Sequence, residues 1–221
     1  LALALKAQNV RIVAPLPGKG TVGIEIPNPK PNIVYIRSVL ESPQFRNTKA
    51  KLPLALGMDV SGTPVVEDLT EMPHLLIAGA TGSGKSVCIN SIITSFAYKL
   101  TPMDLRLLLI DPKRIELSIY NDIPYLIAPV VVDNKEAAAA LNWAISEMEV
   151  RYKVLSAHKV RNIAEYNELI QQKPYLGNKM PYLVIIIDEL ADLMMTVASE
   201  VEEPIARLAQ MARAVGIHLV I

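Results

Sequence analysis

The sequence is poor in cysteine and has no excess of charge of either sign. Its single cysteine, Cys88, excludes a disulfide framework within the chain and is typical of a reducing compartment. Lysine plus arginine number 22 and aspartate plus glutamate also number 22, so no overall basic field indicates a nucleic-acid partner. Such a partner is not excluded, because a ring of subunits can concentrate positive charge in a channel while its outer surface stays balanced.

Long hydrophobic runs are also missing. No stretch approaches the roughly 18 apolar residues of a membrane-spanning helix, and the first residues lack the basic start of a signal peptide. The histidines His74, His158 and His218 have no metal-ligand spacing, which argues against a metal site built from histidine. The chain begins without methionine and ends inside a strand-like run, so we expect a fragment of a longer protein.

The composition that remains is that of a globular protein. The 221 residues are 51% hydrophobic and 20% charged, which is enough to bury a substantial core. Up to about residue 70, short strand-like runs are separated by turns that contain proline and glycine. These runs predict a small α+β subdomain at 1–70, with hairpins in 9–29 and 54–69 and a strand leading into a short helix in 32–42.

From residue 71 onward, continuous apolar runs alternate with segments of helical periodicity. This rhythm predicts an α/β domain at 71–221, with a parallel sheet that helices cover on both faces. We expect helices at 85–100, at 135–172 with a break near His158, and at 202–214. The five buried strands that we expect lie at 74–80, 106–111, 128–133, 182–188 and 217–221.

The run "GATGSGKS" at 79–86 matches the phosphate-binding pattern G-x-x-x-x-G-K-[ST] at every fixed position. It follows an expected strand and opens an expected helix, so its backbone N–H groups and the helix dipole can face phosphates. Lys85 is expected to reach the β- and γ-phosphates, and the Ser86 hydroxyl to bind Mg²⁺. The predicted nucleotide-binding residues are Gly79, Ala80, Thr81, Gly82, Ser83, Gly84, Lys85, Ser86 and Val87.

Two expected strands end in aspartate, and either carboxylate can hold the magnesium ion. We place both at strands next to the phosphate-loop strand and assign the metal to Asp188, because Glu189 follows it at once and can orient the attacking water. Asp111 is followed by Pro112 instead. The alternative for Glu189 is a first-turn acid favoured by the helix dipole. The pair predicts hydrolysis of the nucleotide and not only its binding.

The arrangement of a strand-terminal aspartate followed by glutamate resembles that of a class of P-loop proteins whose members are mostly RecA-like and AAA-type motors. Several separate blocks together resemble one family more closely, the FtsK/SpoIIIE bacterial DNA translocases. The blocks lie at 10–28, 54–69, 72–95, 107–126, 151–167, 181–195 and 205–221.

This resemblance implies a RecA-like P-loop core that uses ATP and Mg²⁺, preceded by the small subdomain. It also implies a homo-hexameric ring that encloses double-stranded DNA and moves chromosomal DNA during cell division or sporulation. A membrane tether outside the present sequence is expected to place the full-length protein at the cytoplasmic face of the bacterial inner membrane, whereas the present fragment is expected to be soluble and cytoplasmic.

The resemblance further implies a catalytic arginine that acts on the neighbouring subunit. Arg213, just before the last expected strand, occupies the place of that residue, and Arg207 is a weaker candidate. The alternative for Arg213 is a cation that favours the end of a helix. Lys113 and Arg114, which follow a strand at the same edge as the nucleotide, can sense the nucleotide, contact the next subunit, or be solvated.

Two other functions stay open. One is a related P-loop motor of secretion or conjugation, which moves protein or single-stranded DNA. The other is a scaffold of the division machinery that binds ATP without moving anything. Stimulation of ATP turnover by duplex DNA separates the translocase from both.

Overall fold

The protein is described by a computed structural model that covers residues 10–16, 20–28, 30, 32–80 and 82–221. The chain forms two compact units, Leu1–Tyr35 and Ile36–Ile221. The domain boundary that the sequence places at residue 70 stays a prediction. Within the described residues, none of the helices is both long and apolar enough to cross a membrane.

In the first unit, strands β1 (Arg11–Val13) and β2 (Gly23–Glu25) form an antiparallel pair. Ile12 lies opposite Ile24, and Arg11 lies 3.5 Å from Glu25 in an ion pair across the two strands. The hairpin expected here is therefore formed. Its turn at 17–19 lies outside the described residues.

The second unit begins with the short helices α1 (Ile36–Leu40) and α2 (Pro43–Arg46), followed by the hairpin of β3 (Pro53–Met58) and β4 (Pro64–Asp68). The strand expected before α1 is absent, because residues 32–35 have no regular structure. The hairpin itself is as predicted. It packs on helix α3 (Lys85–Lys99), where the N–H of Ala55 donates to Ser95 Oγ at 3.1 Å.

The central sheet has three parallel strands in the order β5 (Leu105–Ile110), β6 (Tyr182–Ile187) and β7 (Ile217–Val220). The other two expected strands contribute single parallel bridges, one from Leu75 to Val220 and one from Val131 to Ile110. Among the described residues, the first segment makes backbone hydrogen bonds to 217–221 through Leu75 and Ile77 only. In the second, Pro129 has no N–H to donate to a neighbouring strand.

These pairings correct the expectation that the strands of Asp111 and Asp188 lie next to the phosphate-loop strand. The segment at 75–77 pairs with β7, and β7 pairs with β6, so β7 separates the phosphate-loop segment from the strand that ends at Asp188. Local sequence carries no signal for this order, because it is set by contacts between residues far apart in the chain.

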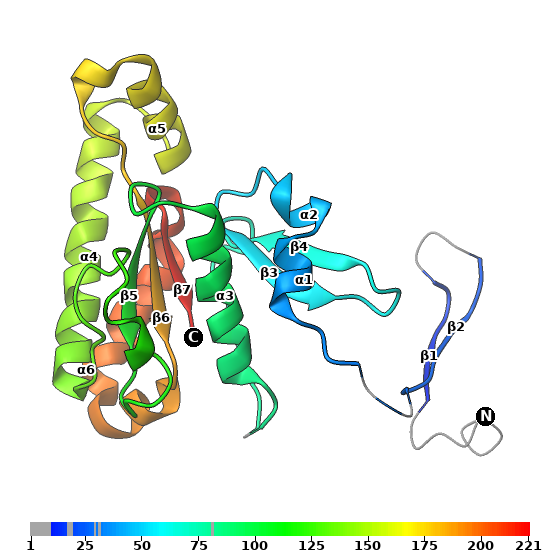
Figure 1. Ribbon diagram of the computed structural model, residues 1–221. Helices are drawn as coiled ribbons and strands as arrows, with labels where there is room; N and C mark the ends of the chain where they lie inside the picture. Colours follow the sequence, from blue (N-terminus) through cyan, green and yellow to red (C-terminus); the bar gives the residue numbers. More distant parts are fainter. Residues whose placement is uncertain (1–9, 17–19, 29, 31, 81) are drawn as a thin grey trace. The chain divides into compact units, whose positions relative to one another are not determined.

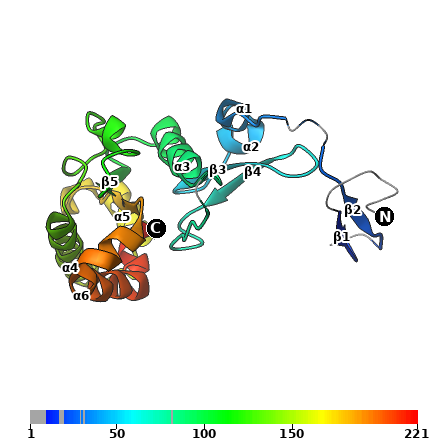
Figure 2. The same ribbon diagram turned by 90° about the horizontal axis from the view of Figure 1, so that it is seen from below.

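Helices cover both faces of the sheet, as Figures 1 and 2 show. On one face, Val184 and Ile186 of β6 share a core with α3. On the other face, Ile185 and Ile187 share a core with the long helices α4 (Asn134–Ala157) and α6 (Leu190–Met211). The alternation along β6 is what a strand buried on both sides requires.

The long helical stretch predicted at 135–172 is confirmed as two helices, α4 and α5 (Ile163–Gln172), separated at His158–Asn162. The helix expected at 202–214 is longer than predicted. It begins at Leu190, has a non-helical kink at Val197 and contains Pro204. The described residues also include the short 3₁₀ helices η1 (Ser118–Tyr120), η2 (Pro174–Leu176) and η3 (Arg213–Val215).

Candidate functional site

The phosphate-binding loop connects the segment at 75–77 to the start of α3. Gly82 and Gly84 have φ values of 82° and 100°, a backbone conformation that disfavours a side chain, and Gly84 is the residue that precedes the first turn of α3. A Cβ on Gly79 would lie 2.1 Å from Ser83 Oγ. The local structure therefore needs glycine at these positions. Thr81 lies outside the described residues.

The loop borders a hollow of about 440 Å³. Larger hollows of about 520 Å³ and about 670 Å³ lie elsewhere on the second unit, but neither is lined by the phosphate-binding loop. The candidate site is therefore identified by the residues that line the hollow and not by the volume of the hollow. Besides loop residues, the hollow is lined by Lys113, Ile115, Glu116, Asp188 and Glu189.

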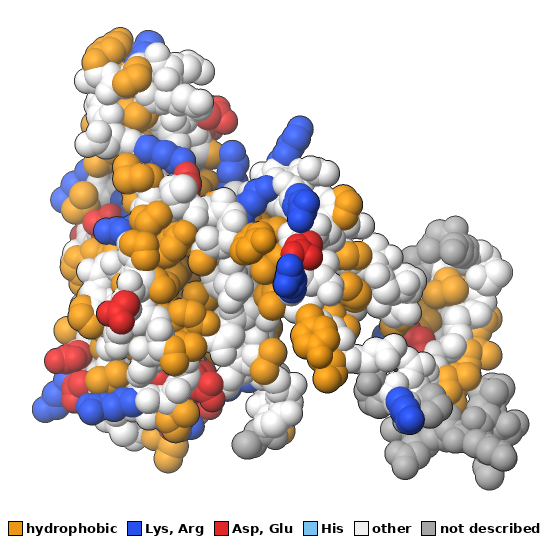
Figure 3. Space-filling view, viewed as in Figure 1, with side chains coloured by type: hydrophobic (Ala, Val, Ile, Leu, Met, Phe, Trp, Pro, Cys, Tyr) orange, Lys and Arg blue, Asp and Glu red, His pale blue; other side chains and the backbone are white. Residues whose placement is uncertain are grey.

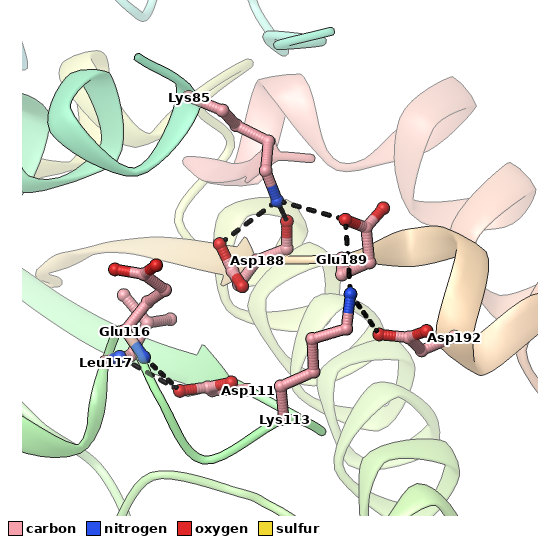
Figure 4. Close-up of polar contacts among 8 residues, drawn as sticks. All are labelled: Lys85, Asp111, Lys113, Glu116, Leu117, Asp188, Glu189 and Asp192. Atoms are coloured by element: carbon pink, nitrogen blue, oxygen red, sulfur yellow. Dashed lines mark hydrogen bonds and ion pairs between the residues drawn. The ribbon is translucent and has the colours of Figure 1, made fainter. Parts of the chain in front are cut away.

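Lys85 joins the loop to the end of β6 (Figure 4). Its Nζ donates to the backbone oxygen of Asp188 at 2.5 Å and to Asp188 Oδ1 at 3.2 Å, and it lies 3.3 Å from Glu189 Oε2. The lysine predicted to bind phosphate and the two acids predicted to act in hydrolysis are thus brought together. The predicted roles of these residues remain predictions.

Asp188 directly follows β6 and is only 5% exposed. Burial raises the pKa of this carboxyl, whereas Lys85 lowers the pKa and the nearby charges of Asp111 and Glu116 raise it further. A buried carboxylate of this kind favours a cation beside it. Asp188 and Ser86 line the same hollow, and a carboxylate and a hydroxyl offer hard oxygen atoms of the kind that Mg²⁺ prefers.

The remainder of a magnesium shell does not have to come from the protein. Across the part of the chain that the structure describes, no group of three or more histidine, cysteine, aspartate or glutamate side chains can hold a metal ion alone. Mg²⁺ in nucleotide sites takes one or two protein ligands and completes its coordination with phosphate oxygens and water. The donor set therefore fits Mg²⁺ bound together with a nucleotide.

Asp111 has a different task from Asp188. Its side chain is fully buried, and its Oδ2 accepts the N–H groups of Glu116 and Leu117, each at 3.0 Å. Its backbone oxygen accepts the N–H of Arg114, whose φ of 59° is unusual for a residue with a side chain. Asp111 therefore shapes the turn at 111–117, which supports giving the metal to Asp188.

That turn carries Lys113 to the second acid (Figure 4). Lys113 Nζ lies 3.7 Å from Glu189 Oε2 and 3.2 Å from Asp192 Oδ2, and its pKa is raised, mainly through its contact with Asp192. The sequence left the role of Lys113 open and did not single out Asp192. A sequence signal for Asp192 exists, because it follows Glu189 by three residues, about one helical turn.

Arg213 is not part of this cluster. It is exposed and begins η3, just before the N-terminal end of β7, whereas Asp188 follows the C-terminal end of β6. Because β6 and β7 are parallel, the two residues lie at opposite edges of the sheet. Arg207 is paired with Glu149 at 2.7 Å, which links α6 to α4.

Family models match nearly the whole chain. The model of the FtsK/SpoIIIE family matches residues 35–221, and the model of the FtsK alpha domain matches residues 1–28. The DNA translocase FtsK of Clostridium tetani (strain Massachusetts / E88) is 57% identical over 221 residues, which are all of this chain and 30% of that protein. The DNA translocase SftA of Bacillus subtilis (strain 168) is 54% identical over the whole chain, which covers 23% of that protein.

Solved structures confirm the predicted fold. The cytoplasmic domain of the type VII secretion ATPase EccC of Thermomonospora curvata aligns with a TM-score of 0.73 at 22% identity, over 86% of this chain and 24% of that one. The pCW3 conjugation coupling protein TcpA, in its monomer form with ATPgS, aligns with a TM-score of 0.68 at 24% identity, over 100% of this chain and 60% of that one. The architecture is that of a P-loop protein.

Proposed function

The chain belongs to the FtsK/SpoIIIE family, and from this premise we propose that it is part of a motor that hydrolyses ATP to move double-stranded DNA. The support is the 57% identity, over the full chain, to a relative named a DNA translocase. The chain spans about 30% of that relative, so its activity, substrate and partners come to this protein as parts of the proposal.

One observation carries the proposal at the level of the site, namely the contact of Lys85 with both Asp188 and Glu189. The backbone of the phosphate-binding loop holds the phosphates of ATP, and Lys85 turns from the carboxylates to the β- and γ-phosphates. Ser86 and Asp188 would hold Mg²⁺, which would supply positive charge to neutralise part of the phosphate charge. Glu189 then orients a water molecule and accepts its proton. The water oxygen bonds to the γ-phosphorus, the bond from that phosphorus to the β–γ bridging oxygen breaks, and ADP and phosphate leave.

The proposal also includes other copies of this chain as partners. The subunits form a homo-hexamer around the DNA, and Arg213 of each one completes the ATP site of a neighbour. Its exposed position at the edge of the sheet opposite Asp188 supports a role on another subunit over a role in its own site. The full-length protein lies at the cytoplasmic face of the bacterial inner membrane and handles chromosomal DNA during cell division or sporulation.

DNA contact does not follow from bulk charge. On the face that Figure 3 shows, lysine and arginine side chains are interspersed with aspartate and glutamate side chains, in agreement with a net charge of zero. A binding surface for the DNA phosphates therefore has to arise locally, where subunits of the ring bring their loops together.

The deciding experiment measures ATP turnover with and without linear duplex DNA, in the wild type and in Lys85→Ala. We expect duplex DNA to stimulate ATP turnover in the wild type, and we expect Lys85→Ala to abolish that turnover. Stimulation by single-stranded DNA or by a protein substrate, but not by duplex DNA, would instead support a secretion or conjugation motor. Slow turnover that no polymer changes would support a scaffold of the division machinery.

A further inference from the structure

The Glu189 carboxylate lies between two lysines from different parts of the chain. Its Oε2 atom is 3.3 Å from Lys85 Nζ on the phosphate-binding loop and 3.7 Å from Lys113 Nζ on the turn after β5. In the proposed function Lys85 moves to the phosphates when ATP binds. Lys113 does not belong to the phosphate-binding loop, so it can stay with Glu189 when Lys85 leaves.

We infer that Lys113 is a positioning residue, which holds the Glu189 carboxylate in the orientation needed to act on water while Lys85 is engaged by ATP. This inference rests on the proposed function and adds a residue to its site. Lys113 acts through Glu189, and it touches neither the phosphates nor the water in this role.

The need for such a residue follows from the position of Glu189. Glu189 is the N-cap of α6, but its side chain makes no capping hydrogen bond to the first turn of that helix. The helix therefore leaves the carboxylate free to rotate. A side chain with several rotatable bonds that is not tethered spends much of its time away from the one orientation that hydrolysis requires.

Lys113 is itself held in two ways. Its ammonium lies 3.2 Å from Asp192 Oδ2, so it bridges the start of α6 to the first turn of the same helix. The turn that carries Lys113 is held by Asp111, which accepts the N–H groups of Arg114, Glu116 and Leu117. Asp111 thus affects Glu189 indirectly, because it shapes the turn that places Lys113 beside that residue.

The ion pairs of Lys113 with Glu189 and Asp192 are not expected to stabilise the fold. The Lys113 side chain is 47% exposed, and exposed pairs contribute little to stability because water and salt screen them. The expected effect of removing Lys113 therefore falls on the hydrolytic step. The sequence left three roles open for Lys113: sensing the nucleotide, contacting the next subunit, and solvation. An effect confined to hydrolysis distinguishes positioning from nucleotide contact and from solvation.

The test compares Lys113→Met, Lys113→Arg and the control Lys135→Met in the full-length protein. Lys135 lies in the first turn of α4, borders the hollow beside Lys113 and makes no ion pair within the described residues. For Lys113→Met we expect kcat for ATP to fall about tenfold while KM stays within about twofold, because the effect is confined to hydrolysis. Lys113→Arg should recover most of the loss, and Lys135→Met should match the wild type.

Binding of a fluorescent ATP analogue supplies a readout that does not depend on turnover. Affinity that is unchanged in Lys113→Met supports positioning, whereas a loss of fivefold or more would identify a phosphate contact and overturn the inference. Unchanged kcat in Lys113→Met would overturn it as well. In a Glu189→Gln background, the Lys113 substitution should have almost no further effect on single-turnover rates, since its target is gone.

Failure of the inference is distinct from failure of the proposed function. If the wild type shows no turnover that depends on Lys85, the proposed function fails and the inference fails with it. If the wild type turns over ATP and Lys113→Met matches it, only the inference fails.

Discussion

Lys85 and Asp188 lie 103 positions apart in the sequence, yet the ammonium of Lys85 is 3.2 Å from Asp188 Oδ1. The contact forms because the phosphate-binding loop and the end of β6 meet at the same edge of a parallel sheet, although β7 separates their strands. This edge is where α/β sheets bind their ligands. The two residues therefore mark the centre of the site. The roles of Asp111 and Glu189 can be tested by comparison with Asp188.

The two strand-terminal aspartates can be told apart by their response to magnesium. Asp188→Asn should raise the Mg²⁺ concentration needed for half-maximal ATP turnover by about tenfold or more, because a charged ligand is lost. Asp111→Asn should leave it unchanged within about twofold, since an amide oxygen can still accept from Glu116 and Leu117. A Mg²⁺ titration of turnover decides this. A shift in Asp111→Asn alone would show that Asp111 holds the metal and that the assignment to Asp188 is wrong.

Glu189→Gln is expected to separate ATP binding from hydrolysis. Glutamine has nearly the same shape but cannot accept a proton from water, so turnover should fall at least about 100-fold while ATP still binds. Steady-state turnover and binding of a fluorescent ATP analogue measure the two effects. The matched control is Glu136→Gln, in the first turn of α4, which should turn over ATP like the wild type. Normal turnover in Glu189→Gln would remove this residue from the mechanism.

Features with a local cause could be predicted from the sequence. The phosphate-binding loop is recognisable because its glycines meet local backbone demands at positions 79, 82 and 84. The strands β5 and β6 are recognisable because each is a continuous apolar run, as burial on both faces requires. The break between α4 and α5 follows from local periodicity as well.

Features set by distant contacts could not be predicted. The insertion of β7 between β6 and the phosphate-loop segment depends on which strands pair. The approach of Lys113 to Glu189 depends on a turn held by a buried aspartate. Arg151 appears in the sequence as an ordinary helical cation, yet it is 5% exposed and donates to the backbone oxygens of Pro181 and Val215.

Arg213 can be tested by mixing subunits. If it acts on a neighbour, Arg213→Ala should lower turnover by at least about 100-fold, the scale expected for an arginine that stabilises charge on the transferred phosphoryl group. Adding Lys85→Ala subunits, which hydrolyse nothing themselves but carry an intact Arg213, should restore part of the activity. Turnover measured against the mixing ratio shows this.

The control for that experiment is Arg207→Ala. Arg207 pairs with Glu149 within the same chain, so its loss should lower activity little and respond to no mixing. An Arg213→Ala protein that no ratio of Lys85→Ala subunits rescues would assign Arg213 a role within its own subunit, such as a favourable charge at a helix end.

The last prediction concerns His218, in the middle of β7. The ring is 1% exposed, its Nδ1 is 2.6 Å from the backbone oxygen of Pro73, and His74, Tyr182, Asp68 and Arg213 are the titratable or charged groups near it. Burial lowers its pKa from 6.5 to about 4. His218 is therefore neutral in the folded protein at pH 5, whereas the same residue in the unfolded chain is mostly protonated.

This difference makes stability depend on pH in a defined window. Between pH 6.5 and about 4 the unfolded chain binds a proton that the folded chain does not, so the free energy of unfolding falls as the pH falls. The loss in the free energy of unfolding reaches about 3 kcal/mol near pH 4, at 1.36 kcal/mol for each pKa unit, and levels off at lower pH. Chemical denaturation at pH 7.5, 6 and 4.5 measures it. His218→Asn keeps an N–H that can donate to Pro73 but does not titrate, so its stability should fall less over the same window. Parallel curves for the two proteins would mean that His218 is as easily protonated in the folded chain as in the unfolded one.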